Sequence, residues 1–255
     1  MLSLFHRRRA AAPVPAAATI PAGMRVYAIG DVHGRLDLLT LLLDQIHADD
    51  RARTPAQTHV LLLGDLIDRG PDSAGVVRCA MAGDARFASL DSVMGNHEAS
   101  LLAVLDGDAR WLASWLSYGG RAALTSWGVP EQVLERGDPD EIIAAASDAV
   151  PAGERIWLSD RARQRRFGDY LFVHAGVRPG LPLDQQYDED LLWIRDEFLN
   201  DDSDHGMIVV HGHTISREPE VRSNRIGIDT GAYLSGTLTA LGLEGGDRWF
   251  LATAG

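Results

Sequence analysis

The 255-residue chain contains no lysine, and all 24 of its basic residues are arginine. This absence excludes a P-loop nucleotide hydrolase, which uses a lysine to reach the phosphates, and any mechanism that forms a Schiff base on lysine. Cysteine is nearly absent as well, since Cys79 is the only one. A single cysteine excludes a disulfide within the chain and a cysteine-rich zinc module.

The chain also lacks a long apolar run and an excess of positive charge. No segment approaches the roughly 20 apolar residues of a membrane-spanning helix, so we expect a soluble, cytoplasmic protein with no membrane partner. With 36 acidic residues the formal net charge is −12, which argues against a general nucleic-acid binder. The apolar fraction of 45% is sufficient for the core of one large domain or two small ones.

Residues 1–24 differ in composition from the rest of the chain. They contain three consecutive arginines, Arg7 to Arg9, then a stretch rich in alanine and proline, and no acidic residue. A secretory signal would place its positive charges before an apolar segment, and this segment does not. We therefore expect a disordered Arg/Ala/Pro tail over residues 1–24, with a targeting or docking arm as the alternative, and a folded domain over residues 25–255.

Short β-branched and aliphatic runs recur from Arg25 onward and alternate at first with helical patterns. The order strand–helix–strand–helix predicts an α/β fold with parallel pairing in its first half. Short, glycine-rich connections later in the chain suggest a second sheet rich in hairpins. The predicted helices are Leu36–Ala48 and Ser73–Ala82, and the predicted strands are Val26–Ile29, Val60–Leu63, Ser89–Met94, Tyr170–Val173, Met207–Val210, Arg225–Ile228, Thr237–Leu243 and Arg248–Ala252.

From about Ala99 to Phe167 the pattern changes to short helices separated by turn signals such as Asp138-Pro139. We predict that this stretch is a helical cap insertion rather than an independent domain. Its tryptophans fill the core of the cap in one interpretation, and in the other one of them stacks on a nucleobase. Its arginines form either a solvated helix face that counters nearby acids or a docking surface for an anionic substrate. The tryptophans are Trp111, Trp115, Trp127 and Trp157, and the arginines are Arg161, Arg163, Arg165 and Arg166.

Five segments at the ends of predicted strands carry clusters of polar residues. Because the carboxyl ends of strands in an open α/β sheet face one crevice, we expect these clusters to lie together. Asp, Asn and His are ligands for divalent metals such as Mn, Fe, Zn, Ni and Co, and buried carboxylates need a cation. The clusters read Gly30-Asp31-Val32-His33-Gly34, Gly64-Asp65-Leu66-Ile67-Asp68-Arg69-Gly70, Gly95-Asn96-His97-Glu98, His174-Ala175-Gly176 and His211-Gly212-His213-Thr214.

This set of motifs, in this order, resembles the phosphoprotein phosphatase (PPP) family of metallophosphoesterases from Arg25 to about Leu243. Leu192–Arg195 and Ile228–Ala232 are similar to its bacterial and phage branch, that of the phage lambda protein phosphatase. The resemblance implies a calcineurin-like metallophosphoesterase fold. Two packed mixed β-sheets would be flanked by helices in an α/β/β/α sandwich, with a helical cap insertion at about residues 99–167.

The resemblance also implies a binuclear metal centre, for which we expect Mn²⁺, with Fe, Zn, Ni or Co as alternatives. Its first metal would be held by Asp31 and His33, and Asp65 would bridge to the second. The family's last ligand is the histidine directly after a glycine, which favours His213, whereas His211 is expected at the end of its strand, lining the pocket edge. The ligands expected for the second metal are Asp65, Asn96, His174 and His213.

The implied reaction is direct attack on phosphorus by a hydroxide that bridges the two metals, without a phosphoenzyme. Arg69 and Arg195 are the arginines expected to bind the phosphoryl oxygens, beside Asn96. His97 is expected to protonate the leaving oxygen, with Asp68 orienting its ring. Glu98 is expected to be a structural hydrogen-bond acceptor.

The favoured interpretation is a phosphatase that acts on phosphoserine and phosphothreonine in proteins, with phosphotyrosine as a further substrate. The alternative is a bis(5'-nucleosyl)-tetraphosphatase, which needs the same metals and arginines. Relatives with that activity tend to carry GNHD where this chain has Asn96-His97-Glu98, and this difference favours the protein phosphatase. A catalytically inactive phosphate-binding module would lack at least one ligand, and none is missing.

Overall fold

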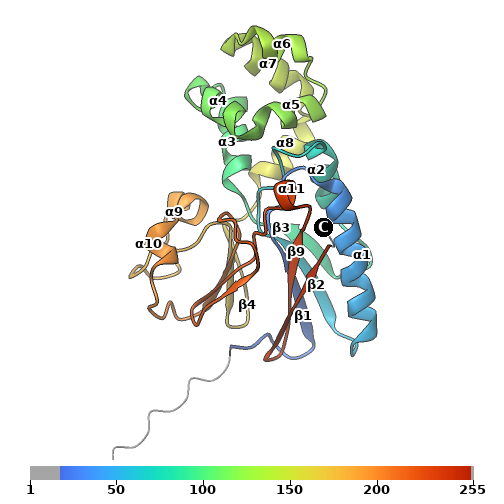
Figure 1. Cartoon of the computed structure of the whole chain (residues 1–255), viewed down its shortest axis with the longest axis vertical. Helices are drawn as coiled ribbons and strands as arrows, with labels where there is room; N and C mark the ends of the chain where they lie inside the picture. The colour runs from blue at the N-terminus through green and yellow to red at the C-terminus, as the bar shows by residue number, and fades with distance from the viewer. Residues whose placement is uncertain (1–17, 254–255) are drawn as a thin grey trace, which may run out of the picture.

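The computed structural model describes residues 18–253, which form two five-stranded sheets that pack face to face with helices outside them (Figure 1). The strands of the first sheet are β1 (Met24–Ile29), β2 (Gln57–Leu62), β3 (Ser89–Ser92), β9 (Thr239–Glu244) and β10 (Asp247–Ala252). Their spatial order is β10-β9-β1-β2-β3. β1, β2 and β3 run parallel, β9 is antiparallel to β1, and β10 is antiparallel to β9.

The second sheet has a parallel centre and antiparallel edges. Its strands are β4 (Gln164–Phe167), β5 (Tyr170–Val173), β6 (Ile208–His211), β7 (Glu220–Val221) and β8 (Arg225–Gly227), and their spatial order is β4-β5-β6-β8-β7. β5, β6 and β8 are parallel to one another, whereas β4 and β7 pair antiparallel with their neighbours.

Alternate residues of β1 show how the layers are built. Val26 and Ala28 pack between the two sheets, in a core that includes Phe172 and Ile226 of the second sheet. Tyr27 and Ile29 point to the opposite face, where they join the core formed with the helices. Successive side chains of a strand point to opposite faces, and a strand covered on both faces is apolar throughout. This arrangement explains the apolar run from Val26 to Ile29 in β1.

Helices cover both outer faces of the sandwich. α1 (Leu36–Ala52) and α2 (Ser73–Ala82) pack on the first sheet, and α9 (Asp188–Trp193) and α10 (Asp196–Leu199) pack on the second. A short helix, α11 (Ala232–Ser235), precedes β9. The α/β/β/α sandwich expected from the sequence is therefore confirmed. Within the described residues no helix is both long enough and apolar enough to cross a membrane.

A helical insertion follows β3 and extends beyond one end of the sandwich (Figure 1). We use this name for helices α3 to α8. They are α3 (Asn96–Leu105), α4 (Ala109–Trp115), the π-helical turn η1 (Leu116–Gly120), α5 (Arg121–Ser126), α6 (Glu131–Arg136), α7 (Pro139–Ala149) and α8 (Ala152–Ser159).

Several expectations about the elements need correction. β9 and β10 complete the first sheet rather than a hairpin-rich second sheet, because β9 pairs with β1. The prediction of helices up to Phe167 is wrong for its last four residues, since Gln164–Phe167 form the edge strand β4 beside β5. The short strand β7 was not predicted.

The expected disordered tail lies outside the described residues for positions 1–17. Its remaining part packs on the folded body. Ile20 is buried between the sheets, and its N–H donates to the carbonyl of Gly245 at 2.8 Å. The hydroxyl and N–H of Thr19 both donate to the carboxylate of Asp169. The ordered region therefore begins several residues before Arg25.

Candidate functional site

The polar clusters lie where the strands of both sheets end. Ile29 of β1 pairs with Leu62 of β2, so the residues that follow these two strands leave the sheet at the same edge. His174 follows β5 directly, and His213 follows β6 by two residues. The two sheets thus bring their carboxyl ends to a common site beneath the helical insertion.

One group of metal-ligand atoms surrounds Nε2 of His174. This atom lies 2.7 Å from Oδ1 of Asn96, 3.1 Å from Nδ1 of His213 and 3.4 Å from Oδ1 of Asp65. All four side chains are buried. Three of them therefore form a potential metal-binding cluster, with the amide oxygen of Asn96 beside it.

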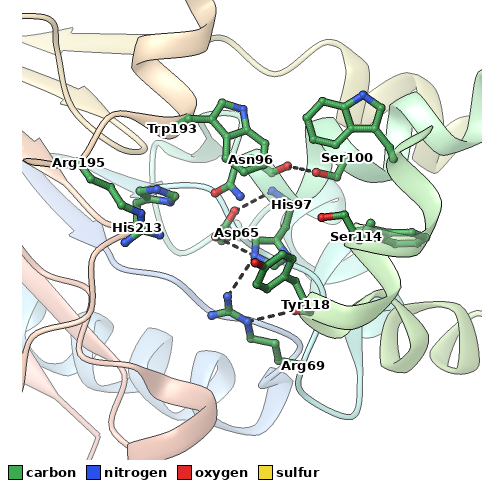
Figure 2. Close-up of a pocket in the computed structure, with 12 residues that line it drawn as sticks. Asp65, Arg69, Asn96, His97, Ser100, Ser114, Tyr118, Trp193, Arg195 and His213 are labelled. Atoms are coloured by element: carbon green, nitrogen blue, oxygen red, sulfur yellow. Dashed lines mark hydrogen bonds and ion pairs between the residues drawn. The ribbon is translucent and has the colours of Figure 1, made fainter. Parts of the chain in front are cut away.

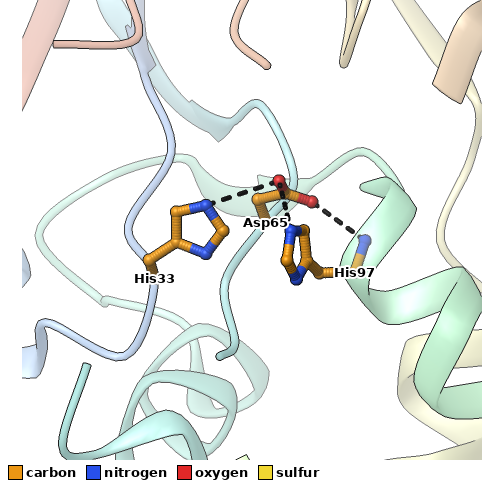
Figure 3. A group of neighbouring side chains, drawn as sticks. All are labelled: His33, Asp65 and His97. Atoms are coloured by element: carbon orange, nitrogen blue, oxygen red, sulfur yellow. Dashed lines mark hydrogen bonds and ion pairs between the residues drawn. The ribbon is translucent and has the colours of Figure 1, made fainter. Parts of the chain in front are cut away.

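A second group shares the same carboxylate (Figure 3). The Nε2 atoms of His33 and His97 lie 3.5 Å and 3.8 Å from Oδ2 of Asp65. Asp65 thus presents one oxygen to each group, which is the arrangement that a carboxylate bridging two metals requires. Asp31 belongs to neither cluster within the described residues. Its carboxylate accepts the backbone N–H of His213 at 3.1 and 3.2 Å.

Backbone carbonyls fix the orientation of two of these imidazoles. Nδ1 of His33 lies 2.8 Å from the carbonyl of Ile67, and Nδ1 of His174 lies 2.8 Å from that of Leu63. Because a carbonyl only accepts, each Nδ1 carries the proton, which leaves the lone pair of each Nε2 available to a metal ion beside Asp65. Such contacts fix the tautomer of metal-binding histidines.

The electrostatics of the site suit a cation. Burial lowers the pKa of His33 to about 3 and that of His213 to about 2, so these rings are neutral. Although burial opposes it, the neighbouring His174 and His97 hold the pKa of the Asp65 carboxyl well below its ordinary value. Among the described residues, Nε2 of His213 is buried without a hydrogen-bond partner, while its Nδ1 faces the cluster. Neutral imidazoles, an amide oxygen and an anionic carboxylate are the ligands that divalent transition metals accept, so the residues fit a dimetal centre.

The backbone of the site is strained at specific positions. Among the described residues, every non-glycine residue with a positive φ belongs to this site. Such conformations cost free energy and persist where the surrounding structure enforces them, often at functional sites. The residues are His33 (φ 45°), Asp65 (47°), Asp68 (75°), Arg69 (67°) and His213 (62°).

Glu98 holds two of the loops together. Its buried carboxylate accepts the N–H groups of Gly95 and Asp65 at 2.9 Å and that of Leu66 at 2.8 Å. A Cβ on Gly95 would lie 2.2 Å from the backbone nitrogen of Asp65, so only glycine fits this close approach. The predicted structural role of Glu98 is confirmed, and its side chain does not line the cavity.

Asp68 and His97 form a buried pair that the helical insertion completes. Nδ1 of His97 donates to Oδ2 of Asp68 at 2.5 Å, and Nε1 of Trp115 donates to the same oxygen at 2.7 Å. The charges of Asp65 and Asp68 raise the pKa of His97 although burial opposes this. The pair has the geometry of a proton donor and its orienting carboxylate.

The two arginines lie on different sides of the ligand clusters (Figure 2). The guanidinium of Arg69 lies 2.9 Å from Nε2 of His33 and 3.3 Å from Nε2 of His97. Its backbone N–H donates to the carbonyl of Gly119, and its Nε donates to that of Tyr118. Arg195 lies on the other side, beside His213.

A cavity of about 300 Å³ opens directly above these groups. Arg69, Arg195 and four predicted metal ligands or catalytic residues line it, and so do four aromatic side chains. Of the tryptophans singled out in the sequence, Trp115 and Trp127 are buried and Trp157 is half-buried against the core, whereas Trp111 is exposed to the cavity. The aromatic residues of the cavity are Trp111, Trp115, Tyr118 and Trp193.

The sequence did not single out Tyr118, and it placed Trp193 only in a segment of resemblance. Their approach to Trp111 depends on how the helical insertion packs beside α9. The spacing Trp193-x-Arg195 was the only available signal, because Arg195 was already expected at the site.

The expected position of His211 at the pocket edge is wrong. His211 is the last residue of β6, and it is buried. Its ring packs edge-on against Phe198 at 5.1 Å between centroids, and the cavity lining does not include it. β6 directs this side chain into the core between the second sheet and α10.

The arginines after α8 do not form a helix face. Arg161 and Arg165 both pair with Asp91, at 2.6 and 2.8 Å, and Arg163 pairs with Asp188 at 2.8 Å. Three of the four charges are therefore balanced by neighbouring acids, as the less specific interpretation expected. Arg165 and Arg166 lie on β4 rather than on a helix.

Comparison with known proteins agrees with this geometry. The family model of the calcineurin-like phosphoesterases matches residues 24–235. Solved structures with a similar fold include a protein assigned as a diadenosine tetraphosphatase (TM-score 0.63, 23% identity, covering 93% of this chain and 99% of that one). Another is a cold-active protein tyrosine phosphatase (TM-score 0.55, 21% identity, covering 91% and 81%). At these identities the likeness concerns the fold.

Curated relatives are similar in sequence over part of the chain. A protein of Aromatoleum aromaticum named symmetrical bis(5'-nucleosyl)-tetraphosphatase is 33% identical over 158 residues, which is 62% of this chain and 46% of the relative. A protein of Methylococcus capsulatus with the same name is 35% identical over 156 residues, 61% of this chain and 44% of the relative. The match thus spans less than half the length of each relative.

Proposed function

The chain belongs to the calcineurin-like phosphoesterase family, and we propose that its metal-dependent phosphoesterase activity acts on dinucleoside polyphosphates. Water would cleave the central phosphoanhydride of a bis(5'-nucleosyl) tetraphosphate, which yields two nucleoside diphosphates. The activity named for the relatives of A. aromaticum and M. capsulatus supports this substrate class.

The observation that carries the proposal is that Arg69 borders two hollows. One is the 300 Å³ cavity, which contains predicted metal ligands, and the other is an open hollow of about 510 Å³, which contains none of them. Arg69 lines both, and Arg121 borders the second. A substrate with a nucleoside at each end of a polyphosphate chain needs such an arrangement, with the scissile bond near the shared arginine.

The structure weakens the sequence argument that favoured a protein phosphatase. That argument rested on Glu98, where relatives active on dinucleotides tend to have aspartate. Glu98 binds backbone N–H groups beneath the site and does not line the cavity. A residue that only shapes the loop carries little information about the substrate.

We assign the groups of the site as follows. His33 and Asp65, with Asp31 close by, would hold one divalent ion. Asp65 with the group of ligands around His174 would hold the other. Mn²⁺ is our first choice for both ions. Such ions supply an activated water and neutralise charge on the phosphoryl oxygens. Arg69 and Arg195 would bind the non-reacting oxygens through charge-assisted hydrogen bonds. The ligands of the second ion would be Asp65, Asn96, His174 and His213.

Hydrolysis of a phosphomonoester is the second candidate, and the His97–Asp68 pair favours it. An alkoxide leaving from phosphoserine needs a proton, whereas a nucleoside diphosphate leaves readily without one. Nδ1 of His97 is held by Asp68, which leaves Nε2 beside Asp65 and Arg69. This nitrogen is placed to protonate a leaving oxygen.

A direct comparison of substrates tests the proposal. Metal-stripped protein reloaded with Mn²⁺ is assayed on diadenosine tetraphosphate and on a phosphoserine peptide under the same conditions. We expect a higher kcat/KM on the dinucleotide, with ADP as the only nucleotide product. A higher kcat/KM on the peptide would make the second candidate correct, and AMP plus ATP as products would contradict symmetrical cleavage.

A further inference from the structure

We propose that Trp111 and Trp193 form a stacking surface for a nucleobase in the 300 Å³ cavity. The proposal rests on the function proposed above, because the base is that of the dinucleoside substrate. It adds where one nucleoside binds and which residues select it. Trp111 lies on α4 of the helical insertion, Trp193 is the last residue of α9, and both line the cavity.

The indoles of Trp111 and Trp193 are partly exposed, whereas that of Trp115, the third tryptophan of the cavity, is buried. Trp111 is 38% exposed and Trp193 is 37% exposed, whereas Trp115 is 2% exposed. The ring centroids of Trp111 and Trp193 are 5.7 Å apart, with an angle of 34° between the planes. They are in contact, so a third ring does not fit between them, and together they offer one apolar surface. A planar ligand that stacks on this surface would bury it.

The surroundings of the surface suit a base that carries phosphates. The ring of Trp193 lies 6.4 Å from that of His213, a predicted metal ligand, and Arg195 follows two residues later on the same segment. A base stacked here would thus lie next to a guanidinium and to the reacting phosphate. Asp65 is the only carboxylate among the residues that line the cavity, so an anionic ligand meets little repulsion.

A polar group is also available for the base or the ribose. The hydroxyl of Ser114 lines the cavity and makes no hydrogen bond within the part of the chain that the structure describes. Figure 2 shows this side chain between Tyr118 and Ser100, facing the ligand clusters. The cavity volume is at the lower end of the range for small-molecule sites, which suits one nucleoside rather than two.

Equilibrium binding tests the stacking surface separately from catalysis. The dissociation constants of ADP and inorganic pyrophosphate are measured by calorimetry with the Mn²⁺-loaded protein. The base-free probe reports on the metals and arginines alone. We expect Trp111→Ala and Trp193→Ala each to weaken ADP binding about tenfold relative to pyrophosphate, a loss typical of a single base–aromatic stack. Trp111→Phe should recover most of the loss, because it restores an aromatic face.

Phe250→Ala is the matched control, since Phe250 is an aromatic residue of β10 with 39% exposure that does not line the cavity. It should leave both dissociation constants unchanged. Equal weakening of ADP and pyrophosphate in the tryptophan variants would overturn the inference, and so would a wild-type protein that binds ADP no more tightly than pyrophosphate. Tighter, tryptophan-dependent binding of phosphotyrosine would assign the surface to a phosphoaryl side chain instead. If ADP shows the expected pattern but diadenosine tetraphosphate is not cleaved, the proposed function fails and the nucleobase site stands.

Discussion

The sandwich and the helical insertion contribute different things to the same cavity. All side chains that the sequence predicted as metal ligands follow strands of the sandwich, and all are buried. The insertion begins with one of them, Asn96, and its remaining helices supply the wall of the cavity: Trp111, Ser114 and Tyr118. Most predicted metal ligands therefore belong to the sandwich, whereas the insertion contributes Asn96, the proposed proton donor His97 and much of the cavity wall.

Several contacts connect the two regions at the site. Trp115 of the insertion donates to Asp68, and the carbonyl of Gly119 accepts the N–H of Arg69. Gly119 has a φ of 121°, and a Cβ there would lie 2.6 Å from the nitrogen of Arg69. The insertion thus positions both Asp68, the partner of the proposed proton donor, and Arg69, which we propose binds phosphate. Substitutions in the two regions should accordingly have different effects. Those at metal ligands of the sandwich should reduce metal binding and turnover on every substrate, whereas those in the insertion should change the relative activity on different substrates.

The largest effect is expected for Asp65→Asn in the sandwich. Asp65 faces both ligand groups, so the amide should weaken both metal sites. Since even the partners of metal ligands contribute about 10- to 100-fold, kcat/KM should fall by more than about a hundredfold on every substrate. Steady-state assays at saturating Mn²⁺ check this, with circular dichroism to show that the variant is folded. Retained activity would mean that Asp65 does not bridge.

His97→Asn should have the next largest effect, and one that depends on the substrate. Loss of a general acid costs about 10²- to 10⁴-fold where the leaving group needs a proton. We expect such a loss of kcat on a phosphoserine peptide and a much smaller one on diadenosine tetraphosphate. Parallel assays on the two substrates measure the ratio. An equal loss on both would assign His97 to metal or phosphate binding instead.

Trp115→Phe removes a single hydrogen bond that the insertion makes to the site. Without it, Asp68 should hold His97 less firmly, and kcat on the phosphoserine peptide should fall by about tenfold, the worth of a hydrogen bond to a charged group. The insertion offers a matched control in Trp127→Phe, because Nε1 of Trp127 donates to Glu154 at the same distance of 2.7 Å, away from the cavity. The control should lower the melting temperature but not kcat. Similar kcat values for the two variants would show that Trp115 has only a structural role.

The smallest effect is expected for Arg165→Ala. Arg165 lies on the edge strand β4 of the sandwich and does not line the cavity. Arg165 pairs with Asp91, whose charge Arg161 also balances. We expect kcat/KM on either substrate to stay within about twofold, and the free energy of unfolding to fall by no more than about 1 kcal/mol, as for other exposed ion pairs. A specific rise in KM would instead identify the arginines as a docking surface.

The sequence was informative about the sandwich and much less so about the insertion, for a physical reason. Motifs that follow parallel strands of one sheet meet at one edge, so His33 after β1 and Asp65 after β2 could be placed together although they are apart in the chain. The contact of Trp111 with Trp193 depends on the packing of short helices, for which no comparable rule exists. His211 was misplaced because the alternation of β6 turns it into the core. The positive φ angles at Asp68 and Arg69 are imposed by tertiary contacts, so the conformational preferences of these residue types did not predict them.

The most direct test of the account is the number of metal ions that one chain binds. Metal-stripped wild-type protein is titrated with Mn²⁺ in a calorimeter, and the bound metal is quantified after gel filtration. The shared carboxylate of Asp65 between two ligand groups predicts two ions per chain for the wild type. A stoichiometry of one ion or none would contradict the binuclear centre on which the assigned chemistry depends.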